Sequence, residues 1–171
     1  LGGGGRPPPK AESLVEEYRA AVAAVLGEAG FGTPGMPLVI GGKSMGGRVA
    51  SLLAGDLYRQ GRIAGLVCLG YPFHPPAKPD QLRTAHLKSL ACPALIVQGE
   101  RDPFGSRAEI EALMAARALS PAIRFHWAGD GDHDLGPRGG SGFTRKANIA
   151  AAAEAVAAWC RALQGPQALT P

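Results

Sequence analysis

Residues 37–48 read PLVIGGKSMGGR, a segment that combines a strand, a sharp turn and the start of a helix. The first four residues form a short apolar run beside glycines, which is typical of a strand buried on both faces of a parallel sheet. Apolar residues then recur at helical spacing and predict a helix over 45–60. Gly42, Ser44 and Gly46 have the GxSxG spacing of a turn that projects a serine hydroxyl. Close packing is expected to exclude a side chain at both glycines.

The same alternation of strands and helices continues along the chain. Helices are also expected over 11–29, 81–90, 106–118 and 144–163, and strands over 65–69, 93–98 and 122–127. This order predicts an α/β fold in three layers, with a doubly wound, mostly parallel sheet and helices on both faces. The domain is expected to span 11–165, after a flexible arm over 1–10 and before a short tail over 166–171.

Composition excludes several classes of protein. Hydrophobic residues make up 46% of the 171 residues and charged residues 19%, close to globular averages of about 45–50% and 25%, so a disordered chain is excluded. The net charge of +4 comes without a polybasic run, so neither nucleic acid nor a membrane surface is an expected partner. No segment approaches the roughly 18 consecutive apolar residues of a membrane span.

The cysteines indicate the compartment. Cys68, Cys92 and Cys160 lack CxxC spacing and lie in apolar segments, which indicates buried, reduced thiols in a cytoplasmic protein. The sequence has no initiator Met and no signal-peptide pattern, which leaves open that the chain is a fragment.

A carboxylate and an imidazole follow two later strands. Asp102 comes after the third predicted strand and His133 after the fourth, and groups at the carboxyl ends of parallel strands meet at one edge of the sheet. The order Ser44, Asp102, His133 is that of an α/β-hydrolase triad. Ser44 would attack a carbonyl group, His133 would carry its proton and Asp102 would orient His133. The backbone N–H of Met45 would help to bind the oxyanion.

Two other interpretations of the glycine-rich turn remain open. Ser44 could simply cap the helix that follows it. Gly42-Lys43-Ser44 also resembles the end of a phosphate-binding loop, although that motif requires glycine where Pro37 stands. Nucleotide binding would depend on magnesium and would be lost on Lys43→Ala.

The alternating acidic run Asp130, Asp132, Asp134 suggests a calcium loop. That motif requires glycine at the sixth position and glutamate at the twelfth, where Leu135 and Ser141 stand. Neither a metal nor a cofactor is therefore expected.

Other polar and aromatic residues have simpler explanations. His126 is expected to be structural within its strand, and His86 is expected to face solvent on its helix. The Pro-rich loop after the second strand is a candidate wall of an apolar substrate pocket through Tyr71, Pro72, Phe73 and His74.

Four blocks in the same order resemble a known family: GKSMGGR (42–48), GYPFHPP (70–76), QGERDPFG (98–105) and GDHDL (131–135). They are similar to the dienelactone-hydrolase-like predicted hydrolases of the α/β-hydrolase superfamily. That group is related to testis-expressed protein thirty and to the third KANSL subunit of a histone-acetyltransferase complex. The resemblance implies the α/β-hydrolase fold and the triad Ser44, Asp102 and His133, but no particular substrate.

The resemblance also implies a departure from the family pattern. Members usually begin with a strand and a His-Gly-Ala-Gly-like loop that supplies a second oxyanion N–H, and the chain has no such loop. An N-terminally truncated fold is therefore expected, with an unprotected sheet edge that favours a homo-oligomer. Losing one oxyanion donor typically costs about 10²–10³ in turnover.

The leading hypothesis is a serine hydrolase that acts on a small ester or related acyl substrate. The alternative is a non-catalytic binding or scaffold module of the same fold, or a truncated and impaired enzyme.

Overall fold

Four parallel strands form the sheet of this protein. The computed structural model describes residues 10–28 and 37–163, so the predicted tail over 166–171, most of the predicted arm over 1–10 and the predicted helix end at residue 29 lie outside the described residues. The strands are β1 (Val39–Lys43), β2 (Gly65–Leu69), β3 (Ala94–Gly99) and β4 (Ile123–Ala128). They lie in the order β1-β2-β3-β4, and each pairs in parallel with the next.

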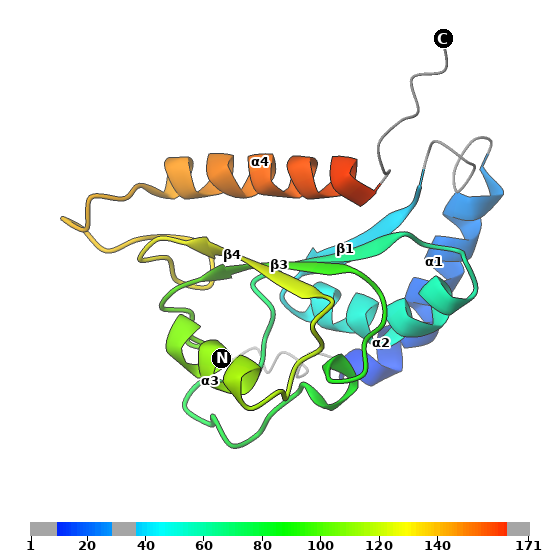
Figure 1. Ribbon diagram of the computed structural model, residues 1–171, viewed down its shortest axis with the longest axis horizontal. Coiled ribbons are helices and arrows are strands. Elements are labelled where there is room, and N and C mark those ends of the chain that lie inside the picture. Colours follow the sequence, from blue (N-terminus) through cyan, green and yellow to red (C-terminus); the bar gives the residue numbers. More distant parts are fainter. Residues whose placement is uncertain (1–9, 29–36, 164–171) are drawn as a thin grey trace, which may run out of the picture.

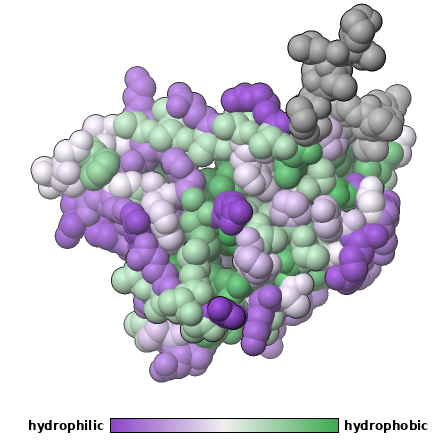
Figure 2. Space-filling view, in the orientation of Figure 1, coloured by the Kyte–Doolittle hydropathy of each residue, from purple (hydrophilic) through white to green (hydrophobic). Residues whose placement is uncertain are grey.

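Helices cover both faces of this sheet (Figure 1). On one face lie α1 (Val15–Gly27), α2 (Met45–Arg59) and α3 (Arg107–Ala115), and α4 (Arg145–Leu163) crosses the other face. This three-layer arrangement confirms the predicted α/β class. The α4 layer is the more exposed one, because Asn148 and Ala152 are its only buried residues. Figure 2 shows hydrophilic and hydrophobic residues intermixed along its outer side.

Two predicted helices differ from those observed. The first begins as a 3-10 turn, Ala11–Leu14, before α1. The helix expected over 81–90 is reduced to the 3-10 turn Ala85–Leu87. Its start is tied to the preceding loop instead, because the Arg83 N–H donates to the Phe73 carbonyl and the Tyr71 hydroxyl donates to the Arg83 carbonyl. Backbone groups paired in this way are not available for a helix.

β1 is an edge strand of the described sheet, and the prediction that it is buried on both faces was wrong. Ile40 is its only buried residue, whereas all six residues of β3 are buried. The Tyr18 hydroxyl of α1 pairs with the backbone of Gly41 in both directions: it accepts from the N–H at 3.0 Å and donates to the carbonyl at 2.7 Å. One side chain thus satisfies backbone groups that a strand would otherwise pair.

The main core lies between the sheet and the helices α1, α2 and α3. Its most buried side chains include Leu53 and Leu57 of α2 and Leu66 and Ile96 of the sheet, each at most 1% exposed. Burying each such side chain contributes roughly 1.5–3 kcal/mol to folding. This core fixes α2 against β1 and β2 and thereby fixes the turn between β1 and α2.

The turn between β1 and α2 depends on glycine at two positions. A Cβ on Gly42 would lie 2.6 Å from the carbonyl carbon of Gly46, and one on Gly47 would lie 2.7 Å from the Gly42 oxygen. A Cβ on Gly46 would meet no atom within 4 Å. The close approach therefore involves Gly47, and the expectation that Gly46 must lack a side chain was wrong.

Alanine substitutions at the two neighbouring glycines test this packing. Gly47→Ala should lower the free energy of unfolding by about 1–3 kcal/mol, because the added methyl group meets backbone that cannot move away. Gly46→Ala is the matched control and should be neutral or stabilising by up to about 1 kcal/mol, since alanine favours helix. Urea denaturation measures both, and equal effects would contradict the account.

Candidate active site

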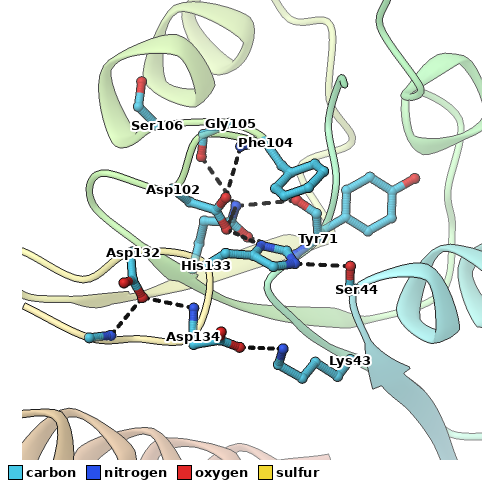
Figure 3. Close-up of polar contacts among 12 residues, drawn as sticks. Lys43, Ser44, Tyr71, Asp102, Phe104, Gly105, Ser106, Asp132, His133 and Asp134 are labelled. Carbon is cyan, nitrogen blue, oxygen red and sulfur yellow. Dashed lines mark hydrogen bonds and ion pairs between the residues drawn. The ribbon is translucent and has the colours of Figure 1, made fainter. Parts of the chain in front are cut away.

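Ser44 has a strained backbone at the junction of β1 and α2. Its φ of 50° and ψ of −118° lie in a region that residues with a side chain rarely adopt. The position is held by a hydrogen bond from the Ser44 N–H to the Leu69 carbonyl at 2.9 Å. The side chain makes no capping hydrogen bond to α2, which disfavours a simple cap, and it is directed toward His133 instead (Figure 3).

Ser44, His133 and Asp102 form a continuous row of hydrogen bonds. Ser44 Oγ lies 2.9 Å from His133 Nε2, and His133 Nδ1 lies 2.8 Å from Asp102 Oδ2. A carboxylate can only accept, so Nδ1 carries the proton and Nε2 presents its lone pair to the serine hydroxyl. The arrangement suits proton transfer from Ser44 to His133.

Asp102 is held by several donors inside the protein. Its side chain is fully buried, and it accepts from the Phe104 N–H at 2.8 Å and from the Gln98 side-chain amide at 2.9 Å. Gln98 is itself fully buried in β3 and also pairs with both backbone groups of Tyr71. Gln98 was not predicted as a site residue, although a glutamine within a buried apolar strand indicates that it has polar partners.

The loop that carries His133 is fixed by its acidic residues. Asp132 accepts from the backbone N–H groups of Asp134 and Gly136, and Asp134 pairs with the Lys43 ammonium group. The Phe104 ring lies against the imidazole, with ring centroids 4.4 Å apart. Asp132 and Asp134 therefore both have partners within the protein.

Asp130 links the His133 loop to the loop that carries Asp102. Its carboxylate pairs with Arg138 and with Arg101, and the Arg101 side chain also donates to the Asp130 carbonyl at 3.0 Å. In return, the Asp130 N–H donates to the Glu100 carboxylate at 2.9 Å. Hydrogen bonds from Arg138 lower the pKa of Asp130 to about 2. The two loops are thus joined by charge-assisted bonds.

A cavity of about 560 Å³ opens beside Ser44. Of the residues predicted to line a substrate pocket, only Pro72 borders it. Met45 and Pro72 line it together with Ser44. Tyr71 and Phe73 lie fully buried in the core instead. His74 is buried beside a separate, smaller cavity, where its Nδ1 contacts the Pro75 carbonyl and its Nε2 faces Glu109.

The remaining histidines and cysteines lie apart from the row of hydrogen bonds. His126 lies within β4, as expected. His86 was expected to face solvent, but its Nε2 lies 2.8 Å from the Ser51 hydroxyl in a half-buried position. Cys68, Cys92 and Cys160 are free thiols, and burial raises the pKa of Cys68 and Cys92 to about 12. These two are therefore neutral and poor nucleophiles.

The fold and this site agree with a known family. A family model described as an alpha/beta hydrolase domain matches residues 2–161. The chain belongs to the α/β-hydrolase family.

Three solved structures share the fold at low sequence identity. An esterase domain from Rhodothermus marinus is 17% identical, with a TM-score of 0.61, covering 88% of this chain and 70% of that one. A thermophilic esterase from Thermogutta terrifontis is 19% identical, with a TM-score of 0.60, covering 92% and 74%. A serine hydrolase homologue from Coxiella burnetii is 19% identical, with a TM-score of 0.54, covering 78% and 58%. The chain thus spans less than two thirds of the Coxiella structure.

Among the described residues, neither a cluster of metal-ligand side chains nor a membrane-spanning helix is found. In residues 10–28 and 37–163, no group of three or more His, Cys, Asp or Glu side chains is placed to hold a metal ion. Within the same part of the chain, every helix is too short or too polar to cross a membrane.

The depressed pKa of Asp130 predicts a pH-dependent contribution to stability. Because the pKa is lower in the folded state than the usual 3.8, the contribution is complete above about pH 4 and disappears as the pH falls toward 2. Asp130→Asn keeps a residue that tolerates the positive φ of 47° and removes the charge. The free energy of unfolding of this variant should fall well below that of the unsubstituted protein at pH 6 and approach it at pH 2.5.

Urea denaturation across this pH range measures the difference. Asp56→Asn is the matched control, because Asp56 forms an exposed pair with Arg59 far from both loops, and its effect should be smaller. A destabilisation by Asp130→Asn that stays constant from pH 6 to pH 2.5 would contradict the assigned role of the charge.

Proposed function

We propose that this α/β-hydrolase is a serine hydrolase that cleaves small esters or related acyl compounds through Ser44, His133 and Asp102. The observation that carries the proposal is the row of hydrogen bonds from the strained Ser44 through His133 to the buried Asp102. The descriptions of two structural neighbours as esterases are consistent with it.

The chemistry follows the usual course of acyl transfer. His133 Nε2 takes the hydroxyl proton as Ser44 Oγ attacks the carbonyl carbon, and Asp102 stabilises the imidazolium that forms. The Met45 N–H lies in the first turn of α2, where amide groups have no intrahelical partner, and it is a donor for the oxyanion. His133 then gives its proton to the departing alcohol, and a water molecule activated by His133 hydrolyses the acyl-serine.

The structure offers a second serine–histidine contact that serves as a control. Ser51 Oγ lies 2.8 Å from His86 Nε2, but Ser51 is only 2% exposed and donates to the Arg48 carbonyl. Burial lowers the pKa of His86. No third side chain in the described residues orients this imidazole by a hydrogen bond, so we assign it no catalytic role.

Covalent labelling tests the proposal at the nucleophile. A fluorophosphonate should add one adduct to the folded protein, as measured by intact mass, and Ser44→Ala should abolish it. Ser51→Ala should keep it, because Ser51 is neither strained nor exposed. Asp102→Asn should slow labelling strongly, since loss of this carboxylate costs on the order of 10⁴ in turnover in triad enzymes.

Two results would contradict the proposal. One is the absence of an adduct on a chain whose circular dichroism shows that it is folded, which would favour a non-catalytic binding module. The other is an adduct that persists in Ser44→Ala, which would place the reactive group elsewhere.

A further inference from the structure

The cavity beside Ser44 has a marked excess of positive charge. Its lining includes the basic residues Lys10, Arg48 and Arg83 and a single acidic residue, Glu12. Ser44 and Met45 belong to the same lining, so these charges surround the place where an acyl substrate would bind. The N-terminus of α2 adds a partial positive charge at this point.

Arg48 is only partly neutralised within the protein. One of its terminal nitrogens pairs with the Glu12 carboxylate, and its Nε is buried without a hydrogen-bond partner. A hydrogen bond from its own backbone, together with the nearby Arg48, lowers the pKa of Glu12. Glu12 is therefore charged at neutral pH and balances one of the three cations of the cavity.

Arg83 has no carboxylate partner in the described part of the chain. Its backbone is fixed, because its N–H donates to the Phe73 carbonyl and its carbonyl accepts from the Tyr71 hydroxyl. Burial raises the pKa of Tyr71, and both Arg48 and Arg83 oppose that shift, so the two cations lie near the same hydroxyl group. Arg83 thus lines the cavity on a backbone held in place, and its side chain has no carboxylate partner in the described residues.

Other basic residues around the site differ from Arg83 in this respect. Arg101 and Arg138 pair with Asp130, Arg107 pairs with Glu100 and Glu111, and Lys43 pairs with Asp134. These four cations each pair with a carboxylate, whereas Arg83 and Lys10 of the cavity lining form no salt bridge within the described residues. Because Arg83 is half-buried and has no carboxylate partner, it favours an anion from solution.

We infer that the hydrolase prefers esters that carry a second, negatively charged group, a carboxylate or a phosphate, bound by Arg83 with help from Arg48 and Lys10. This inference rests on the proposed function of Ser44. A guanidinium group can donate two parallel hydrogen bonds to either anion. The charge of the substrate would also raise the rate of its encounter with the cavity.

Two matched substrates test the inference. The mono-p-nitrophenyl ester of glutarate carries a carboxylate, and its methyl ester has nearly the same shape without the charge. At low salt, kcat/KM should be at least about tenfold higher for the charged ester, and added salt should reduce this ratio. Inhibition by free glutarate and by inorganic phosphate then distinguishes the two kinds of anion.

Substitutions identify the residue responsible. Arg83→Gln should reduce kcat/KM about tenfold more for the charged ester than for the neutral ester, whereas Arg83→Lys, which keeps the charge without the paired hydrogen bonds, should retain only part of the preference. Arg59→Gln, at the far end of α2 and paired with Asp56, is the control and should change neither substrate. An equal effect of Arg83→Gln on both esters, or no preference in the unsubstituted protein, would overturn the inference.

The labelling experiment separates the two hypotheses. Labelling of Ser44 by an uncharged fluorophosphonate, combined with equal turnover of the two esters, would overturn the inference and leave the proposed function standing. If Ser44 is not labelled, the proposed function fails. Glutarate binding measured by calorimetry then still tests whether the cavity binds an anion. Binding that Arg83→Gln abolishes would support the anion site, and no binding to the unsubstituted protein would overturn it.

Discussion

The buried carboxylate of Asp102 is the constraint on which the site depends. Burying a charge is costly unless every oxygen has partners, and here they come from three different segments. Gln98 of β3, the Phe104 N–H of the following loop and His133 of the loop after β4 all pair with this one group. Satisfying Asp102 therefore also fixes the Tyr71 backbone, through Gln98, and the orientation of the imidazole.

Ser44 is fixed by a separate constraint at the end of β1. The close approach of Gly42 and Gly47 packs α2 tightly against β1 and holds Ser44 in its strained conformation. Ser44 and the Asp102–His133 pair meet because β1 and β3 are parallel and both end at the same edge of the sheet, with β2 between them. The Ser44 N–H bond to the Leu69 carbonyl ties the strained residue to that middle strand.

Much of this arrangement was predictable from the sequence, because periodicity and chain order depend on local residues. The strand at Gly65–Leu69 was predicted with its observed bounds, and the positions of Ser44, Asp102 and His133 after three strands were enough to bring them to one edge. Tertiary contacts decided the rest. Arg83 and Arg48 are far apart in the sequence, and only the folded structure places both of them in the cavity lining. Tyr71 and Phe73 lie in the core rather than in the cavity. The exposure of β1 depends on which strands lie beside it, and the pattern of residues within the strand does not predict its neighbours.

Asp102 holds the His133 ring with its Nε2 lone pair facing Ser44. Nitrogen NMR of the histidine-labelled protein tests it most directly, with the His133 signals assigned by comparison with His133→Gln. At a pH where the ring is neutral, we predict a protonated Nδ1 and an unprotonated Nε2, and a partial loss of this preference in Asp102→Asn. A neutral ring protonated at Nε2 would contradict the account, because Ser44 would then have no base to accept its proton.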